Sequence, residues 1–539
     1  MTKTALEKQN NDLRIRLENR NAKAELNLFE AEETIKELKS QLRDKDKVIT
    51  MLQKEIVALN EALEKAADLQ SEEIQQMIRD AMAPILQRLE EAYDEINRLK
   101  AIIDKDSSNS SKPPRTNNFK EIPNNREPSE RKRGGQKGHP GHRLKLPDNL
   151  DELVEQGKVV KELKDHTNGS SEYITRYVID VRVVTTVTEH RFALDAEIPK
   201  GMYNEVSYGD QIEALAVYLL TEGIIAEDRL SDMICGITHG VITISPATIE
   251  KYLSDFAKGL VTNGELDAIK EHLLNGKVMN TDDTPVGCTE TIEYHDDGTT
   301  SILTAKKKSF TATIRNYSNS LSTLFTVNPQ KNIEGIIRDN ILPIYFGILG
   351  HDHESKFYRY GIAHATCGSH LTRDLKGLND LLKIPWADIM RSFILSVNTH
   401  KQKDLAAGIT MCNPIILASF ESKYDDIVKQ GRAELALLDK DAWNYSEFNN
   451  MVNRLIKYKD CYLFFIRDYD VPFTNNLSER DLRSEKTRAK VSGPYRSWKG
   501  INNHVKIRSF ISTLKKREMD LYAAIVDVIQ GTSVLNKPA

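Results

Sequence analysis

The chain has 539 residues, too many for one hydrophobic core, so we expect three or four structural units. No apolar run approaches the roughly 18–20 residues of a membrane helix, which excludes an integral membrane protein. The five cysteines are scattered and include no CxxC pair, which excludes a disulfide scaffold. The net charge of −4 argues only weakly against a nucleic-acid partner, because basic residues gather in stretches 111–146 and 480–507. The charged start MTKTALEKQN lacks the apolar run of a signal peptide and indicates a cytoplasmic protein.

Residues 1–105 predict a coiled coil. A heptad seam has its a positions at Leu28, Ile35, Leu42, Ile49, Ile56 and Leu63, and its d positions at Ala31, Leu38, Lys45, Leu52, Leu59 and Ala66. Ile at a and Leu at d favour parallel two-stranded pairing, so we expect a homo-oligomer, a dimer formed through this segment. The alternative is an antiparallel hairpin within one chain, with its bend near Pro84.

Residues 106–150 predict a basic linker, because they lack hydrophobic periodicity and are rich in Ser, Asn, Pro and Gly. Residues 111–146 hold ten Lys or Arg against three Glu. We expect this arm to bind DNA phosphates, and the alternative is a linker that its charge keeps solvated. The candidate DNA contacts are Arg131, Lys132, Arg133 and Lys137.

Two smaller units follow. Residues 151–204 predict a small β-rich module, because EYITRYVIDVRVVTTVTEHRFA is dominated by Tyr, Ile, Val and Thr. Residues 205–265 predict three helices, the last starting at Ser245-Pro246, which supplies an N-cap and a proline in the first turn. Their spacing is similar to a DNA-binding helix-turn-helix, with helical scaffolding as the alternative.

Residues 266–355 predict the first part of an α/β core of the RNase H-like class. The segments VMNTDDTPV, TSILTAKKK and TLFTVNP read as strands, NIEGIIRDN as a helix, and PIYFGILGHD as a buried strand ending in Asp352. Several strands, a helix and a strand ending in Asp follow one another in the order of an RNase H-like core. We expect a helical insertion at 356–470, then the last core helix and the C-terminal helices at 471–539.

Three carboxylates in this core are candidate metal ligands and catalytic groups. Asp282 and Asp352 each follow a predicted strand, and Glu479 lies near the start of a late helix. Cutting and joining phosphodiesters requires an activated oxygen and a stabilised leaving oxygen, which two Mg²⁺ ions can supply. Magnesium prefers hard oxygen ligands, so carboxylates on rigid elements suit this task. Any one acid alone is more often a solvated surface group.

The motifs resemble the insertion sequence 66 family of transposases over most of the chain. NSSKPP with RKRGGQKGHPGH resembles its linker, and YGDQIEALAVYL with SPATIEKYL resembles its central helices. NTDDTPV and GILGHD resemble its first two acidic motifs, CGSHLTRDLKGL the stretch that follows, and VPFTNNLSERDLRSEKTRAKVSGPYRS the third motif.

This resemblance implies a DDE transposase that uses Mg²⁺ or Mn²⁺, two ions being expected, to cleave element ends and transfer the strands into target DNA. It implies Asp282, Asp352 and Glu479 as the metal-binding acids, with accessory proteins of the same element as further candidate partners. The alternatives are a non-catalytic coiled-coil DNA-binding regulator and an RNase H-like nuclease without strand transfer. The sequence departs from the family in lacking cysteines in KELKDHTNGSSEYITRY, in having Asp283 after Asp282, and in having HESKF after Asp352.

Two further groups of residues have competing interpretations. Cys367 and His370 have metal-ligand spacing, but a closed zinc site needs about four ligands, which favours a buried structural pair. A basic surface is expected beside Glu479, where it would hold DNA phosphates, and the alternative is a solvated cationic helix. Its members are Arg480, Arg483, Lys486, Arg488, Lys490, Arg496 and Lys499.

Overall fold

The computed structural model describes residues 40–61, 72–106, 109–110, 146–295 and 297–535, except for residues 167, 169–170, 173, 199–204 and 307. Over these ranges, none of the helices is both long enough and apolar enough to cross a bilayer. The predicted DNA contacts in the basic linker, and the seam positions before residue 40, lie outside the described residues.

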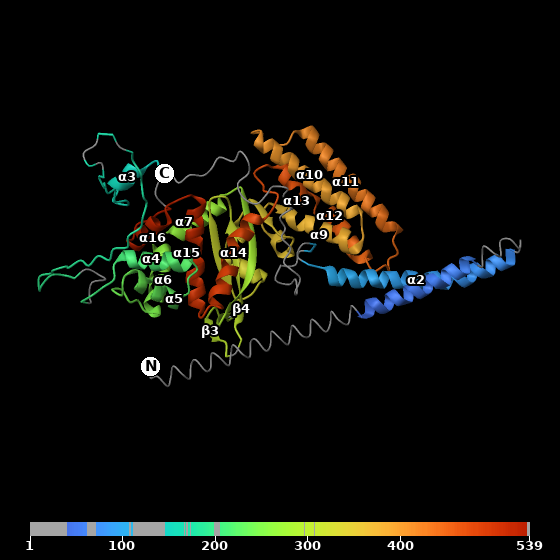
Figure 1. Ribbon diagram of the computed structural model, residues 1–539, viewed down its shortest axis with the longest axis horizontal. Helices are drawn as coiled ribbons and strands as arrows, with labels where there is room; N and C mark the ends of the chain where they lie inside the picture. Colours follow the sequence, from blue (N-terminus) through green and yellow to red (C-terminus); the bar gives the residue numbers. More distant parts are fainter. Residues whose placement is uncertain are drawn as a thin grey trace.

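A five-stranded mixed sheet forms the centre of the molecule (Figure 1), with the strand order β5-β4-β1-β6-β7. The strand β1 is antiparallel to β4, which is antiparallel to β5, whereas β6 runs parallel to β1 and β7 runs parallel to β6. A separate two-stranded sheet contains β2 and β3. The strands in chain order are β1 (Val278–Cys288), β2 (Glu290–Tyr294), β3 (Thr300–Thr304), β4 (Phe310–Ser318), β5 (Thr323–Asn328), β6 (Ile348–His351) and β7 (Ala363–Thr366).

The predicted β1, β5 and β6, and the helix α8 (Ile333–Asp339), are confirmed, but three details of the core were wrong. The predicted strand at β3 lies outside the central sheet, in the exposed hairpin with β2. The central strand β4 was not predicted, because Arg315 and Asn316 interrupt its apolar pattern, although both are fully buried. The strand β7 lies inside the range predicted to be a helical insertion, so the inserted helices begin only at Gly368.

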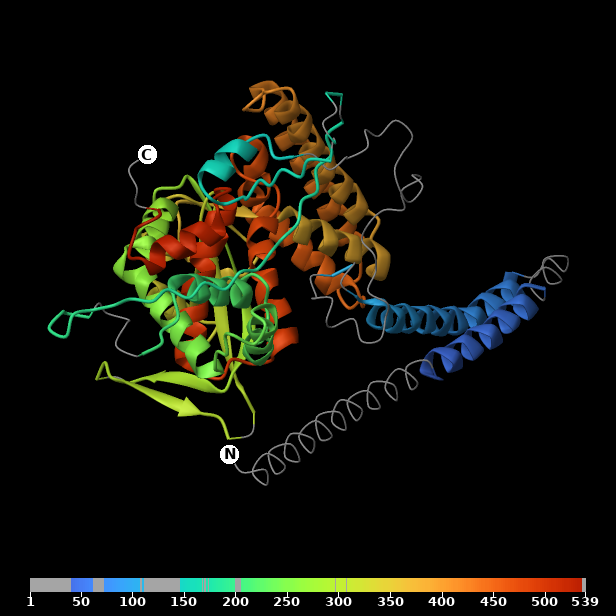
Figure 2. The ribbon, with the colours of Figure 1, turned by 60° about the vertical axis from the view of Figure 1, so that its left-hand side comes forward.

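On one side of the sheet, helices that precede β1 in the chain pack together with the C-terminal helices (Figures 1 and 2). They are α4 (Asp210–Thr221), α5 (Glu227–Ile237), α6 (Pro246–Thr262), α7 (Glu265–Leu274), α15 (Trp498–Lys516) and α16 (Leu521–Ile529). The helix α15 packs on β5, and Phe256 of α6 meets Phe510 of α15 edge to face at 6.1 Å. The predicted start of α6 is confirmed, because the Ser245 side chain accepts a hydrogen bond from the Thr248 N–H. DNA binding by this region stays a prediction.

The insertion between β7 and the last core helix consists of five helices around a common core. Its central residue is Trp386, which is fully buried and donates to the Ile427 carbonyl oxygen at 2.6 Å. Close to it stands Gly431, where a Cβ would lie 2.4 Å from the indole ring. The helix α13 contacts the edge strand β7 and so attaches the insertion to the sheet. The helices are α9 (Gly368–Leu382), α10 (Trp386–Ala406), α11 (Pro414–Leu437), α12 (Tyr445–Lys457) and α13 (Lys459–Arg467).

An N-terminal pair of helices projects from the rest of the molecule (Figures 1 and 2). Residues 40–61 form a helix that packs on α2 (Glu72–Asp104), with Ile49 buried against Ala92 and Ile96. The described part of the predicted seam packs on α2 of the same chain, which is the arrangement of the hairpin alternative. The predicted bend near Pro84 is wrong, because Pro84 lies inside α2. Self-association stays a prediction.

The predicted β-rich module is not observed as strands. Among its described residues, α3 (Leu150–Glu155) is the regular element, and residues 174–198 contain no assigned strand. Side chains such as Val178 and Val187 are 91% and 86% exposed. A β-branched run forms a stable strand only when a neighbouring strand completes its hydrogen bonds and covers one face, and no described strand pairs with this one.

Candidate active site

Asp352 follows the end of β6, whereas Asp282 lies inside the neighbouring parallel strand β1 and not after it, contrary to the prediction. The register pairs Val278 with Ile348 and Asn280 with Gly350, so its continuation places Asp282 level with Asp352, one residue beyond β6. Carboxyl ends of parallel strands meet at one edge of a sheet, which is where α/β proteins commonly bind ligands. The fold thus brings together two acids that lie 70 residues apart in the sequence.

Glu479 reaches this edge from the first turn of α14 (Asn476–Ser492), which packs against β1 and β4. The buried Asn475, just before the helix, fixes its start to β1. Its amide nitrogen donates to the Thr281 carbonyl oxygen at 2.9 Å, and its amide oxygen accepts from Asn280 at 2.8 Å. Asn475 occupies the N-cap position, but its side chain bonds to the sheet and does not cap the helix.

A second amide joins the same helix to Asp282. The fully buried Asn316 on β4 donates to the Ser478 carbonyl oxygen at 3.1 Å and accepts from the Ser478 hydroxyl at 2.5 Å. The same Asn316 oxygen also accepts from the Asp282 N–H at 3.1 Å. Two asparagines therefore hold the backbones on which Asp282 and Glu479 stand, and satisfied polar groups of this kind make a buried junction rigid.

The electrostatics indicate that these acids share one space. The pKa of Asp282 is raised to about 7, first by burial and then by the negative charges of Asp352, Asp283 and Glu479, against one lowering hydrogen bond from the Asp283 N–H. The pKa of Asp352 is raised to about 6 by burial and by the charge of Glu354, and Lys331 acts in the opposite direction. Such repulsion is relieved by a proton or by a metal cation, and the hard oxygen donors suit Mg²⁺ or Mn²⁺.

The neighbouring Asp283 has a different environment. Its carboxylate lies 2.7 Å from the Lys331 ammonium, 2.6 Å from that of Lys356 and 3.5 Å from the Arg315 guanidinium. Burial would raise its pKa, but Lys356 and Lys331 outweigh this effect and hold the pKa below its ordinary value. Adjacent residues of a strand point to opposite faces, and here one face carries an uncompensated acid and the other a neutralised acid.

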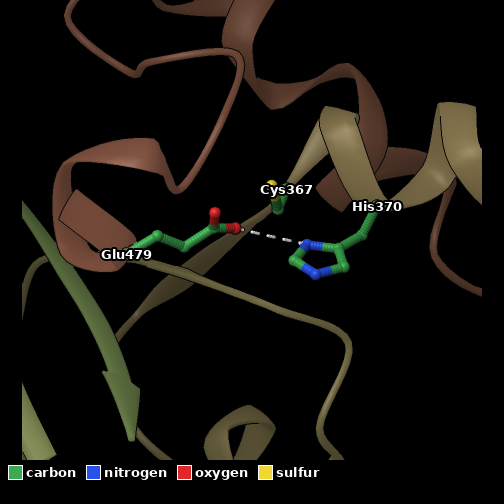
Figure 3. A group of neighbouring side chains, drawn as sticks. All are labelled: Cys367, His370 and Glu479. Carbon is green, nitrogen blue, oxygen red and sulfur yellow. Dashed lines mark ion pairs between the residues drawn. The ribbon is translucent and has the colours of Figure 1, made fainter. Parts of the chain in front are cut away.

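Cys367 and His370 lie next to Glu479 (Figure 3). The His370 Nδ1 atom is 3.8 Å from Glu479 Oε1, and one ligand atom from each of the three residues lies within 4.8 Å of the others. Cys367 precedes α9, and its Sγ accepts a hydrogen bond from the Asn475 N–H at 3.3 Å. No pattern in the sequence connects the Cys367–His370 pair with Glu479, which lies 109 residues beyond His370.

The expected basic surface has two kinds of member. Arg483 stands one turn after Glu479 on α14 and is exposed. Arg488 is half-buried, with its guanidinium carbon 3.4 Å from the centre of the Tyr495 ring. Arg508, directly after the basic stretch 480–507, is buried and paired with Glu222 at 2.6 Å, so it is not part of this surface. The other exposed members are Arg480, Lys486, Lys490, Arg496 and Lys499.

Sequence reasoning missed the residues that position Asp282 and Glu479 and the residues that neutralise Asp283. Asn316 and Asn475 hold the acids in place, and Lys331 with Lys356 separates the environments of Asp282 and Asp283. A signal was present for Asn475 in the Asn-Asn pair before Glu479, where an amide can bond to a neighbouring strand as well as to its own helix. The lysines gave no such signal, because each meets Asp283 only through the tertiary fold.

Comparison with known proteins identifies relatives of most of this region. The model of the family described as "Transposase IS66 family" matches residues 205–503, more than half of the chain. A second model, "Family of unknown function (DUF6444)", matches residues 53–145. No curated protein matches the chain. Among solved structures, the Drosophila P element transposase strand transfer complex aligns at 12% identity over 60% of this chain and 95% of that chain, with a TM-score of 0.28 that is too low to support an argument.

Proposed function

The chain belongs to the IS66 family of transposases, which are DNA-processing enzymes, and on this premise we propose that Asp282, Asp352 and Glu479 are its catalytic acids. The reaction is cleavage at the ends of an insertion element, followed by transfer of the freed strands into target DNA. The observation that carries the proposal is the raised pKa of Asp282, caused by burial and by the charges of Asp352, Asp283 and Glu479. Perturbed acids that converge at a sheet edge are typical of functional sites.

The proposal assigns a metal-binding role to the three acids. Two Mg²⁺ or Mn²⁺ ions bound between them would activate the attacking oxygen and stabilise the leaving oxygen. The two aspartates stand on adjacent strands, and Glu479 stands on a helix that Asn475 fixes to β1. A constellation held by a sheet and a buried amide network keeps its geometry when DNA binds.

The remaining parts of the chain serve DNA binding and assembly in this proposal. The mixed sheet, with an antiparallel part, a helix and a parallel strand ending at Asp352, is an RNase H-like core. The exposed cations after Glu479 hold phosphates near the acids, and the arm around Arg131, Lys132, Arg133 and Lys137 adds affinity without sequence choice. A dimer through the N-terminal segment would pair two element ends.

A strand-transfer assay on candidate terminal repeats with Mg²⁺ tests the function. Asp282→Asn, Asp352→Asn and Glu479→Gln each keep the side chain's shape, and each should abolish cleavage and joining while DNA binding remains. Members of one catalytic unit are not additive, so a double variant should resemble a single one. Asp388→Asn is the matched control, because this half-exposed acid pairs with Arg391 on α10.

The same assay separates the two rival functions. A DNA-binding regulator would bind the repeats without cleaving them, and the three acid substitutions would change nothing measurable. A nuclease of the same fold would nick the repeats in a manner that needs the acids, but it would yield no joined products. Joined products that persist in Glu479→Gln would contradict the assignment of this residue.

A further inference from the structure

Cys367, His370 and Glu479 form a cluster that the proposed catalysis does not use as a whole (Figure 3). The imidazole of His370 and the carboxylate of Glu479 point toward each other from α9 and α14, with Cys367 beside them. His370 Nδ1 and Glu479 Oε1 are both shielded from solvent, and neither has a hydrogen-bond partner among the described residues. Buried polar atoms are normally satisfied, so two that face one another at 3.8 Å call for an explanation.

We propose that Cys367, His370 and Glu479 bind one Zn²⁺-class cation at a site that shares Glu479 with the catalytic acids. A thiolate, an imidazole and a carboxylate are the donors that Zn²⁺ takes in proteins, whereas Mg²⁺ favours oxygen alone. The donor set therefore distinguishes this site from the all-carboxylate site formed with Asp282 and Asp352. Three protein ligands leave the fourth tetrahedral position open, as in zinc sites that exchange a ligand.

The distances fit such an ion after a small adjustment. In a tetrahedral site with ligand bonds of about 2.0–2.1 Å, two such atoms lie roughly 3.3–3.4 Å apart, and a sulfur ligand lies slightly farther away. The observed 3.8 Å between His370 Nδ1 and Glu479 Oε1 exceeds this separation by a few tenths of an ångström. The 4.8 Å within which all three ligand atoms lie exceeds it by somewhat over one ångström. Side-chain rotation of Glu479 and His370 can supply this change without moving the backbone.

Burial raises the pKa of the Cys367 thiol, but backbone N–H groups around the sulfur act in the opposite direction. Cys367 is the N-cap residue of the 15-residue helix α9, and the Asn475 N–H donates to its Sγ. Backbone N–H groups at a helix N-terminus stabilise a thiolate, which is the form that binds metal. Asn475 thus serves both sites, because its side chain also fixes the helix that carries Glu479 to β1.

Sharing of Glu479 has a consequence for activity, and this part rests on the proposed function. A carboxylate engaged by Zn²⁺ beside Cys367 and His370 is drawn away from Asp282 and Asp352. Zn²⁺ should therefore inhibit Mg²⁺-dependent cleavage, and a chelator selective for Zn²⁺ should restore it. The binding of the ion itself does not depend on whether the chain cleaves DNA.

Co²⁺ titration of the full-length protein tests the site, because Co²⁺ replaces Zn²⁺ and reports a bound thiolate by an intense near-ultraviolet charge-transfer band. We expect one such band per chain, displaced by Zn²⁺ but not by excess Mg²⁺. Cys367→Ser should remove the band, and Glu479→Gln should weaken Co²⁺ binding by about 100-fold or more, since even outer-shell changes cost 10–100-fold. Cys461→Ser is the matched control for a half-buried thiol outside the cluster and should keep the band.

The outcomes distinguish this inference from the proposed function. Wild-type protein without the band overturns the metal site, whether or not any variant folds, and a band that survives in Cys367→Ser does the same. If wild type lacks the band and His370→Asn slows cleavage, the pair acts as an orienting contact for Glu479, and the metal site is wrong. A band retained in Asp282→Asn, together with wild type that never cleaves DNA, would support this site and refute the proposed function alone.

Discussion

Two adjacent aspartates on β1 should change the stability of the metal-free protein in opposite directions. Asp282 has a pKa of about 7 against its ordinary 3.8, so folding favours its protonated form. The resulting penalty is absent below about pH 4, grows as the pH rises toward 7, and is complete above 7. Asp283 has a lowered pKa, so its favourable contribution is present above about pH 4 and is lost as the pH falls further.

The size of each effect follows from the environment. A pKa of about 7 in place of 3.8 corresponds to at most about 4 kcal/mol, at about 1.4 kcal/mol per pH unit. Asp282 keeps some contact with solvent, which screens its charge, so we expect Asp282→Asn to stabilise the metal-free protein by ~2 kcal/mol near pH 8. Asp283→Asn leaves Lys356 and the fully buried Arg315 with less compensation and should destabilise it by ~3 kcal/mol.

Thermal unfolding in EDTA, followed by circular dichroism at about pH 5 and about pH 8, measures both effects. At about 2–4 °C per kcal/mol, Asp282→Asn should raise Tm by several degrees near pH 8 and by less near pH 5, and Asp283→Asn should lower it by a similar or larger amount. Mg²⁺ should raise the Tm of wild type more than that of Asp282→Asn, because a ligand that binds the folded state stabilises it. Destabilisation by Asp282→Asn in EDTA near pH 8 would refute the view that its carboxylate lacks a cationic partner.

Three further predictions concern the parts around the acids. Asn475→Ala removes two buried hydrogen bonds to β1, so it should cost about 1–3 kcal/mol in urea unfolding and reduce cleavage while Asp388→Asn does not. Reversing the charges of Arg131, Lys132 and Arg133 should weaken binding to all DNAs alike and reduce the slope of log affinity against log salt concentration by about 0.9 per lost phosphate contact. Fluorescence anisotropy at several salt concentrations measures this slope, and an unchanged slope would exclude the arm as a phosphate binder. Residues 1–105 should be helical and self-associate, with Ile49→Asp and Ile56→Asp breaking the assembly; sedimentation that shows only monomer for the unchanged segment would count against the dimer.

The sequence allowed the order of the core elements to be predicted where one residue pattern dominates. The segments VMNTDDTPV, TLFTVNP and PIYFGILGHD indicated β1, β5 and β6, and the Ser245-Pro246 pair marked the start of α6. Local patterns suffice in these cases because each element forms its own hydrogen bonds or caps. Asp352 was correctly expected just beyond a strand, but Asp282 lies inside β1, so its predicted position at a strand end was wrong.

Prediction failed where the environment of a residue depends on contacts with residues far away in the sequence. Arg315 in β4 looks like a surface residue, but Asp339 and Asp283 neutralise it in the interior. Residues 174–198 have strand composition, yet the described part of the chain supplies no partner strand. The seam of residues 40–61 needs an apolar partner, and its pattern alone does not decide between α2 of the same chain and a second copy. Each failure concerns a partner that lies far away in the sequence.

The acids of α14 show why Glu479 is the one available to a cation from outside. The buried Glu485 carboxylate accepts a hydrogen bond from the Tyr495 hydroxyl at 2.9 Å and lies 3.0 Å from His504 Nε2, so the fold satisfies it. Asp481 is paired with Lys516 at 2.8 Å and accepts from Thr323 at 2.8 Å. Glu479 lies 3.8 Å from the His370 imidazole, with Cys367 beside it, and its Oε1 is unsatisfied among the described residues.

The same contrast separates Asp282 from Asp283 on β1, where the protein supplies Lys331 and Lys356 to one acid and further acids to the other. A carboxylate that the fold neutralises contributes to stability, whereas one that the fold leaves beside like charges costs stability until a cation binds. Since unneutralised buried acids are costly, a protein retains them where binding a cation is their function. This reasoning selects Asp282 and Glu479 over their neighbours from the contacts alone, without reference to the family motif.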